Sequence, residues 1–298
     1  MKNEKTSSNG MKILKKSLTG LLMLGVFMGF VFLTSLWNGE GQYFFDALVL
    51  VVLALSTFEM IKCTKSRGYN VEIIPLAIVV AGVYPAIKFL GYFGFFLTLC
   101  AGMILAFCFF VFDQKVTLKD MLMTLFIMLY PITPIMCVLQ TTNLYGMLPF
   151  LLAAASAMLA DTIAYYAGSA IKGPKIFPKI SPNKTYSGCA FGLLGGVAGA
   201  LIVYGMFEVA KLPVNAPILF SNILEYPIIF YVFMGLAIGI VSEVGDLFAS
   251  RVKRELGIKD FSNLLGSHGG LMDRLDSIIF AVLFVAVVVQ FLPIPVLI

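Results

Sequence analysis

The chain has 298 residues, of which 60% are hydrophobic and only 12% are charged, and its formal net charge is +5. Soluble globular domains carry about 25% charged residues, so this composition excludes that class and indicates an integral membrane protein. The basic excess does not call for a nucleic-acid partner, and we expect none, because Lys and Arg also collect on the cytoplasmic loops of membrane proteins.

Apolar runs recur along the chain, and each is close to the roughly 20 residues that a helix needs to cross a bilayer. They predict an all-α, polytopic bundle of about nine transmembrane helices. The boundary between the third and fourth spans depends on Gly91, Tyr92 and Gly94, and Pro131 and Pro134 should kink the fifth span. The predicted spans are 18–37, 43–62, 71–90, 92–112, 121–140, 147–171, 188–208, 226–249 and 275–292.

The placement of basic residues predicts the orientation. If the N-terminus is cytoplasmic, all of the 21 Lys and Arg except Lys88 and Lys211 fall on inside segments. Because basic residues resist translocation, this distribution favours nine spans with the N-terminus inside. The first span is longer than the apolar core of a signal peptide and precedes no A-x-A-like cleavage site, so we expect a retained helix.

Polar residues divide the chain into three parts. A cytoplasmic tail, 1–17, precedes a bundle of five spans, 18–145, in which nothing looks catalytic. There Glu59 is expected to have a structural role, pairing with Lys62 or reaching water. A catalytic region of four spans, 146–298, follows, with cytoplasmic loops 172–187 and 250–274. We expect a multi-pass protein of the cell (plasma or inner) membrane with its active site on the cytoplasmic side.

Ionisable residues lie unusually deep in two of the later spans. Asp161 is in the sixth, and Glu243 and Asp246 are in the eighth. Such groups cost at least a few kcal/mol unless they face protein, water or a cation. Glu243, Asp246, Ser250 and Lys253 share a face if the helix continues to Lys253. A carboxylate there, backed by basic residues, can hold a hydrated Mg²⁺ that bridges to phosphates; the alternative is a salt-bridged helix that snorkels to lipid headgroups.

Two further patterns lie in and beside the loops. The only histidine, His268, precedes a Gly-Gly pair, and a lone histidine favours a hydrogen-bonding role over a metal site. Gly188, Gly192 and Gly196 form a ladder of small residues, as do Gly195 and Gly199, and this pattern predicts close helix packing, of which a homodimer interface would be one form.

The polar segment after the eighth span reads Ser250-x-Val252-Lys253-Arg254-x4-Lys259-Asp260-x-Ser262-x2-Leu265-Gly266-x-His268-Gly269-Gly270-Leu271-x-Asp273-Arg274-Leu275-Asp276. Upstream stand Gly245-Asp246-Leu247, Asp161-Thr162-x-Ala164-Tyr165-x2-Gly168 and Ser181-Pro182-Asn183-Lys184-Thr185-x2-Gly188. Together, over 161–276, these motifs resemble the phosphatidate cytidylyltransferases, the CDP-diacylglycerol synthases. The chain departs from that pattern at Ile163 (usually Gly), Ser187 (usually Glu) and Gly266-Ser267 (usually Pro-Gly). Residues 1–145 match only in being several membrane spans.

The resemblance implies that CTP and phosphatidate react to give CDP-diacylglycerol and pyrophosphate, in phospholipid biosynthesis. It implies Mg²⁺ as cofactor, with a second cation such as K⁺ as an option, and CTP, phosphatidate and membrane lipid as partners. The catalytic residues it implies are Asp246, Lys259, Asp260 and Lys184, and the cation ligands are Asp246, Asp260, Asp161 and Asp273. The implied substrate-binding residues are Ser181, Asn183, Lys184, Thr185, Lys253, Arg254, His268, Gly269, Gly270 and Arg274, with the Gly269 and Gly270 amides either ordering the loop or binding pyrophosphate.

Three other functions remain open at this point. Another CTP-dependent lipid enzyme of the polyprenol kinase type would transfer the γ-phosphate instead. An ion-coupled transporter would use Asp161, Glu243 and Asp246 as an ion path, but it predicts repeats between the two halves that the sequence lacks. A structural membrane subunit leaves the acidic positions unexplained.

Overall fold

The computed structural model describes residues 29, 32–34, 40–182, 184–212, 219–264 and 269–292. Asn183, His268 and most of the predicted first span lie outside the described residues. The chain forms two compact units, 1–48 and 49–298, and the helical arrangement described below is that of the second.

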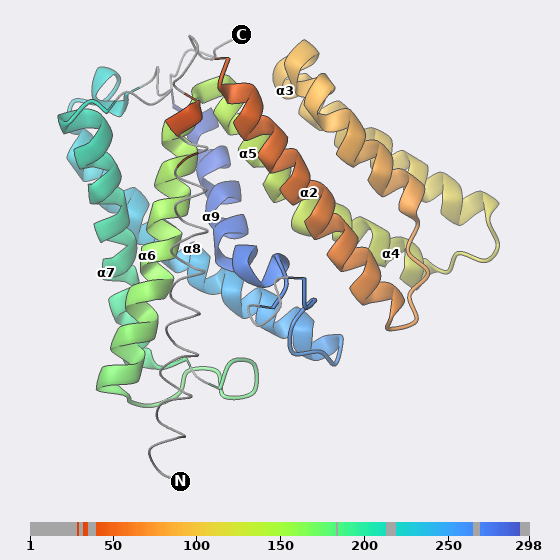
Figure 1. Cartoon of the computed structure of the whole chain (residues 1–298). Helices are drawn as coiled ribbons and strands as arrows, with labels where there is room; N and C mark the ends of the chain where they lie inside the picture. Colours follow the sequence, from red (N-terminus) through yellow and green to blue (C-terminus); the bar gives the residue numbers. More distant parts are fainter. Residues whose placement is uncertain are drawn as a thin grey trace. The chain divides into compact units, whose positions relative to one another are not determined.

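The described residues are predominantly helical, which confirms the predicted all-α class (Figure 1). Their only strand-like pairing is an isolated antiparallel bridge between Lys175 and Thr185. The elements are α2 (Gln42–Lys65), α3 (Ile73–Phe112), α4 (Leu118–Ile127), the π-helical turn η2 (Met128–Ile132), α5 (Thr133–Tyr145), α6 (Met147–Ile171), α7 (Tyr186–Tyr204), the π-helical turn η3 (Gly205–Val209), the 3₁₀ turn η4 (Phe220–Asn222), α8 (Pro227–Glu255) and α9 (Met272–Gln290).

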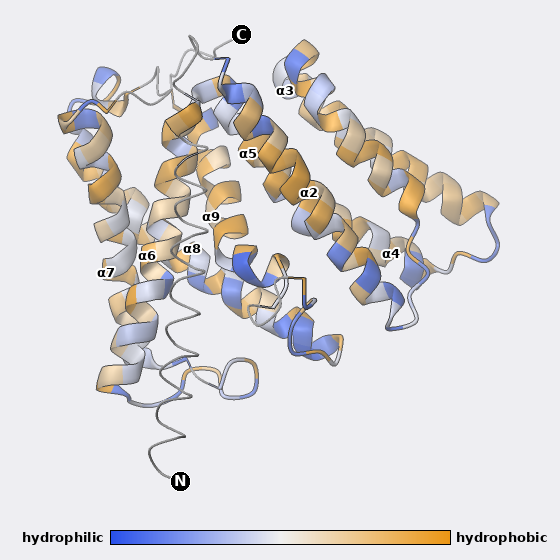
Figure 2. Cartoon of the chain, in the orientation of Figure 1, coloured by the Kyte–Doolittle hydropathy of each residue, from blue (hydrophilic) through white to orange (hydrophobic). Residues whose placement is uncertain are grey.

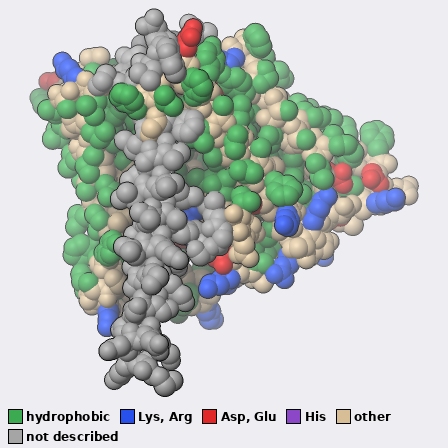
Figure 3. Space-filling model, viewed as in Figure 1, with side chains coloured by type: hydrophobic (Ala, Val, Ile, Leu, Met, Phe, Trp, Pro, Cys, Tyr) green, Lys and Arg blue, Asp and Glu red, His purple; other side chains and the backbone are tan. Residues whose placement is uncertain are grey.

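Six helical stretches within the described residues are long and apolar enough to cross a membrane. One of them, Leu118–Tyr145, joins α4, η2 and α5, and Tyr130 leaves helical geometry just before Pro131, where the sequence predicts a kink. Hydrophobic side chains cover most of the described surface on the face drawn in Figure 3, as expected where helices face lipid. The chain is therefore a multi-pass membrane protein, and the count of nine spans stays a prediction.

The 40-residue helix α3 is folded back on itself at Gly91. Gly91 has φ 55° and ψ −130°, a conformation that favours glycine. On either side of it the chain pairs in antiparallel fashion, because a Cβ on Gly82 would lie 3.7 Å from the Thr98 side chain and one on Gly102 would meet Val79. The predicted boundary between spans 71–90 and 92–112 therefore falls at the observed reversal.

The glycine ladder of α7 serves packing inside the chain. A Cβ on Gly199 would lie 2.6 Å from the Ser156 backbone of α6, and one on Gly196 would lie 3.1 Å from the Gly239 backbone of α8. Close helix packing is thus confirmed, and α7 runs antiparallel to both neighbours. Because contacts within the chain occupy these glycines, a homodimer stays a prediction that the ladder no longer supports.

The polar connections α2–α3, α3–α4, α6–α7 and α8–α9 lie at one end of this unit. Arg67 Nη2 donates to the Gly257 carbonyl at 3.2 Å, and the Asn70 amide donates to Asp120 at 2.6 Å, so the α2–α3 connection contacts both the α8–α9 connection and the first turn of α4. Figure 2 shows hydrophilic stretches at these helix ends and hydrophobic ones along the helices. Lys211 lies in the α7–α8 connection, at the opposite helix ends. This sidedness agrees with the predicted distribution of basic residues.

Gly199→Ala should weaken the contact between α6 and α7. Its Cβ would meet backbone atoms of Ser156 and Ala155 at 2.6 and 2.7 Å, and overpacking of this kind costs about 1–3 kcal/mol. Gly205→Ala is the matched control, because a Cβ on Gly205 has nothing within 4 Å. Thermal unfolding of the purified variants measures the difference, and equal midpoints would contradict the packing described here.

Candidate active site

The α6–α7 loop is shaped to present Lys184. The Lys184 carbonyl accepts a hydrogen bond from the Ile176 amide at 3.2 Å, which folds the loop back on itself. The next residue, Thr185, is the N-cap of α7, and its Oγ1 accepts from the Gly188 amide at 3.1 Å. Lys184 is therefore held one residue before a capped helix, with a defined direction toward α8.

The Lys184 ammonium bridges two carboxylates of α8. Nζ lies 2.5 Å from Glu243 Oε2 and 2.8 Å from Asp246 Oδ2, and these three side chains are 10–29% exposed. Burial by itself lowers the pKa of Lys184, but Asp246 and Glu243 outweigh it and raise the pKa to about 12. Gly192 leaves room for the carboxylate, since a Cβ there would lie 3.0 Å from Glu243 Oε1. The lysine is therefore a permanent cation at neutral pH.

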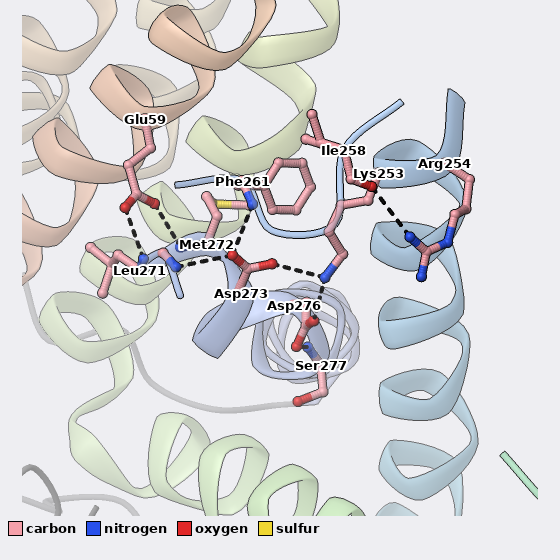
Figure 4. Close-up of polar contacts among 11 residues, drawn as sticks. Glu59, Lys253, Arg254, Ile258, Phe261, Leu271, Met272, Asp273, Asp276 and Ser277 are labelled. Carbon is pink, nitrogen blue, oxygen red and sulfur yellow. Dashed lines mark hydrogen bonds and ion pairs between the residues drawn. The ribbon is translucent and has the colours of Figure 1, made fainter. Parts of the chain in front are cut away.

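A second charged group forms where α8 ends and α9 begins (Figure 4). Lys253 Nζ lies 2.8 Å from Asp273 Oδ1 and 3.9 Å from Asp276 Oδ2. The other Asp273 oxygen accepts from the amides of Phe261 at 2.9 Å and Gly270 at 3.0 Å. Because α8 does continue to Glu255, Lys253 is on the same helix as Asp246, as the sequence predicts.

Asp161 and Asp276 join the two groups into one cluster. Asp276 interacts electrostatically with Asp246, Lys253 and Asp161, and the Asp161 carboxyl is hydrogen-bonded to the Ser277 side chain. The 172–187 and 250–274 loops therefore converge on the C-terminal part of α8, the start of α9 and Asp161, which lies ten residues before the end of α6. The cluster contains two lysines, Lys184 and Lys253, and five carboxyl groups, Asp161, Glu243, Asp246, Asp273 and Asp276.

Glu59 of α2 also reaches this end of the catalytic region. Its role is structural, as expected, but the expected partners, Lys62 or water, are wrong: Glu59 is only 2% exposed. Its carboxylate accepts from the amides of Leu271 and Met272, each at 2.9 Å, and from the Ser262 hydroxyl. A residue from the half of the chain in which the sequence shows nothing catalytic therefore contacts the start of α9.

The remaining predicted residues lie on the same loops and helices as the cluster or outside the described residues. Among the described residues no group of three or more His, Cys, Asp or Glu is arranged to hold a metal ion, so the predicted cation ligands stay a prediction. Ser181 is half-buried in the loop, and Gly269 has φ 78°. Arg254, Lys259, Asp260 and Arg274 are exposed, while Asn183 and His268 are not described.

Sequence reasoning left Asp276, Ser277 and Glu59 out of the site. Asp276 is part of the polar motif that follows the eighth span, and that position could have identified it as a site residue. Ser277 and Glu59 lie outside these motifs, and their side chains have hydrogen-bond partners that are distant in sequence, so no local pattern identifies them.

Glu243→Gln should destabilise the protein by about 1–3 kcal/mol, because it removes the charge from a largely buried hydrogen-bonded pair. Arg251→Met is the control on the same helix, because the Arg251–Glu255 pair is 61% and 64% exposed and such pairs are worth at most about 1 kcal/mol. Thermal unfolding of Glu243→Gln, Lys184→Met and the double variant provides the measurement. Additive losses would contradict a direct Lys184–Glu243 interaction.

Comparison of the sequence with known proteins shows which family the chain belongs to. The model of the cytidylyltransferase family matches residues 19–292. The chain is 40% identical over 121 residues to a phosphatidate cytidylyltransferase of Brucella abortus, covering 41% of this chain and 39% of the relative. It is 33% identical over 147 residues to the Bacillus subtilis enzyme of that name, covering 49% of each, and 27% identical over 295 residues to the Mycobacterium bovis one, covering 92% and 86%. The first two matches span less than half of the relatives' own length, whereas the family match spans nearly all of this sequence, and the chain thus belongs to the cytidylyltransferase family.

Proposed function

We propose that this protein is a CTP:phosphatidate cytidylyltransferase, a nucleotidyltransferase that makes CDP-diacylglycerol for phospholipid biosynthesis. The observation that carries the proposal is the convergence of Lys184, Asp246, Lys253 and Asp276 at the ends of membrane helices. These residues come from the motifs by which the sequence resembles that family, and relatives of that name match the chain.

The chemistry needs little from the protein beyond position and charge. A phosphatidate oxygen forms a bond to the α-phosphorus of CTP, and the bond from that phosphorus to the bridging oxygen of the leaving group breaks, which releases pyrophosphate. Because phosphatidate brings its own anionic nucleophile, the protein must mainly hold two anionic groups in line and offset their repulsion. We assign phosphate contacts to the exposed bases Arg254, Lys259 and Arg274 at the rim of the cluster.

The charge of the cluster supports a divalent cation. Its carboxyl groups outnumber its lysines by five to two, so a triphosphate would be repelled unless a cation came with it. Carboxylate oxygens are the ligands that Mg²⁺ takes in proteins, and a bound Mg²⁺ would offset charge on the phosphate oxygens. Asp246, Asp161 and Asp276 are the candidates; the described carboxyl groups do not form a three-ligand site and Asp246 is paired with Lys184, so a bound cation would have to draw them together. Asp273 is already held by Lys253 and two amides.

Asp246→Asn should lower turnover by about a hundredfold or more, because an amide cannot supply the charge that organises a cation. The assay uses purified protein with labelled CTP, phosphatidate and Mg²⁺. CDP-lipid with pyrophosphate is the expected product, whereas phosphorylated lipid with CDP would indicate a kinase instead. Glu255→Gln, on the same helix but in an exposed pair, is the control and should keep full activity. Normal turnover of Asp246→Asn at saturating Mg²⁺ would remove Asp246 from the site.

We place the cluster on the cytoplasmic side of the cell membrane, where CTP is available. Cysteines introduced at the exposed positions Lys179 and Lys259 should then be labelled only from the cytoplasm, and one at Glu225, in the α7–α8 connection, only from outside. The background variant lacks the five native cysteines, all of which are free. Labelling of Lys179→Cys and Lys259→Cys from outside would overturn the orientation and the use of cytoplasmic CTP.

A further inference from the structure

We infer that Glu59 is a positioning residue of the active site: from α2 it fixes the start of α9, and through it the place of Asp273, Lys253 and Asp276. The inference rests on the proposed function and adds a residue from the first half of the chain, outside the motifs that carry the family resemblance. We assign Glu59 no contact with substrate. It acts through the loop and helix that it holds.

The contacts of Glu59 form a helix cap supplied by another helix. The first residues of a helix leave amides without intrahelical partners, and the N-cap residue of α9, Leu271, offers no side-chain cap. Glu59 Oε1 and Oε2 accept from the Leu271 and Met272 amides at 2.9 Å each (Figure 4). A carboxylate in this position is also favoured by the helix dipole. The cap therefore sets where α9 begins and how it is directed.

The same carboxylate holds the loop that precedes α9. The Ser262 hydroxyl donates to Glu59 Oε1, which ties the segment after α8 to the first turn of α9. Gly270 lies between them, because a Cβ there would be 2.9 Å from Ser262 Oγ and 3.0 Å from Glu59 Oε2. A side chain at Gly270 would have to displace Ser262 or Glu59, so the backbone there lies close to the Glu59 carboxylate.

From Gly270 the contacts lead directly into the charged cluster. The Gly270 amide donates to Asp273 Oδ2 at 3.0 Å, and Asp273 Oδ1 pairs with Lys253 at 2.8 Å. Glu59 and Asp273 thus hold the first turn of α9 from two sides. Without the hydrogen bonds from Glu59 to the Leu271 and Met272 amides, the first turn of α9, which carries Asp273 and leads to Asp276, loses one of its two anchors.

Glu208 provides a matched control elsewhere in the chain. Its carboxylate accepts from the Ser221 hydroxyl at 2.5 Å, the Ser221 amide at 3.3 Å and the Tyr231 hydroxyl at 3.1 Å. Like Glu59, it therefore ties a connection to helices through three donors. Tyr231 precedes Glu243 by 12 residues of α8, so Glu208 lies about 18 Å from the cluster along that helix.

The test compares Glu59→Gln with Glu208→Gln in the full-length protein. Gln keeps the shape but presents an NH₂ group to one of the donors and carries no charge. We expect kcat of Glu59→Gln to fall about tenfold or more, with a much smaller change in KM for CTP. Amide exchange at Leu271 and Met272, followed by hydrogen–deuterium exchange, should become faster by about the same factor. Glu208→Gln should lower thermal stability comparably and leave kcat and these two amides unchanged.

A second variant covers the case in which Glu59→Gln does not fold. Ser262→Ala removes one of the three donors and should lower kcat by a few fold, and the double variant should lose less than the product of the two single losses. Unchanged exchange at Leu271 and Met272, or a kcat loss no larger than that of Glu208→Gln, overturns the inference. If the wild type makes no CDP-diacylglycerol, the proposed function fails, whereas the exchange result still decides whether Glu59 caps α9.

Discussion

Carboxylates at the ends of membrane helices need partners, and the organisation of this site follows from that requirement. An unpaired charge in apolar surroundings costs several kcal/mol. Glu243 and Asp246 are offset by Lys184, and Asp273 is offset by Lys253 together with two amides. Glu59 is offset by two amides at the start of α9 and by the Ser262 hydroxyl. The contacts of Lys184 and of Glu59 join segments that are distant in sequence. The need to satisfy the carboxylates therefore assembles the loops and helix ends into one place.

The two halves of the chain contribute differently to that assembly. The motifs that resemble the family all lie in the second half, but the first half supports them. Glu59 caps α9, Arg67 donates to the Gly257 carbonyl at 3.2 Å, and the Tyr130 ring packs edge-on against Phe248 of α8 at 5.0 Å. Membrane spans that look generic in sequence thus contact α8, the α8–α9 connection and the start of α9.

Much of the fold could be predicted because apolar runs and their interruptions are local signals. The span predicted at 147–171 coincides with α6, and Gly91 alone marks the reversal in α3. The partners of buried charges are not local: Glu59 and Met272 are 213 residues apart, and Lys184 and Glu243 are 59 apart. An acidic residue inside an apolar helix does signal a role. For Glu59, however, Lys62 lies one turn away on the same helix, and an ion pair with it would have been enough to explain the carboxylate.

The amides at the start of α9 already donate hydrogen bonds within the protein, and this limits how the proposed enzyme could bind phosphates. A helix N-terminus is commonly an anion site, but in this protein Glu59 and Asp273 occupy the amides of Leu271, Met272 and Gly270. This favours loop ordering over pyrophosphate binding as the role of Gly270. In the described residues, exposed basic side chains such as Lys259, together with any cation held by the carboxylates, are the groups to which we assign phosphate contacts. Such a site suits a lipid substrate, because long side chains can follow a headgroup that is anchored in the bilayer.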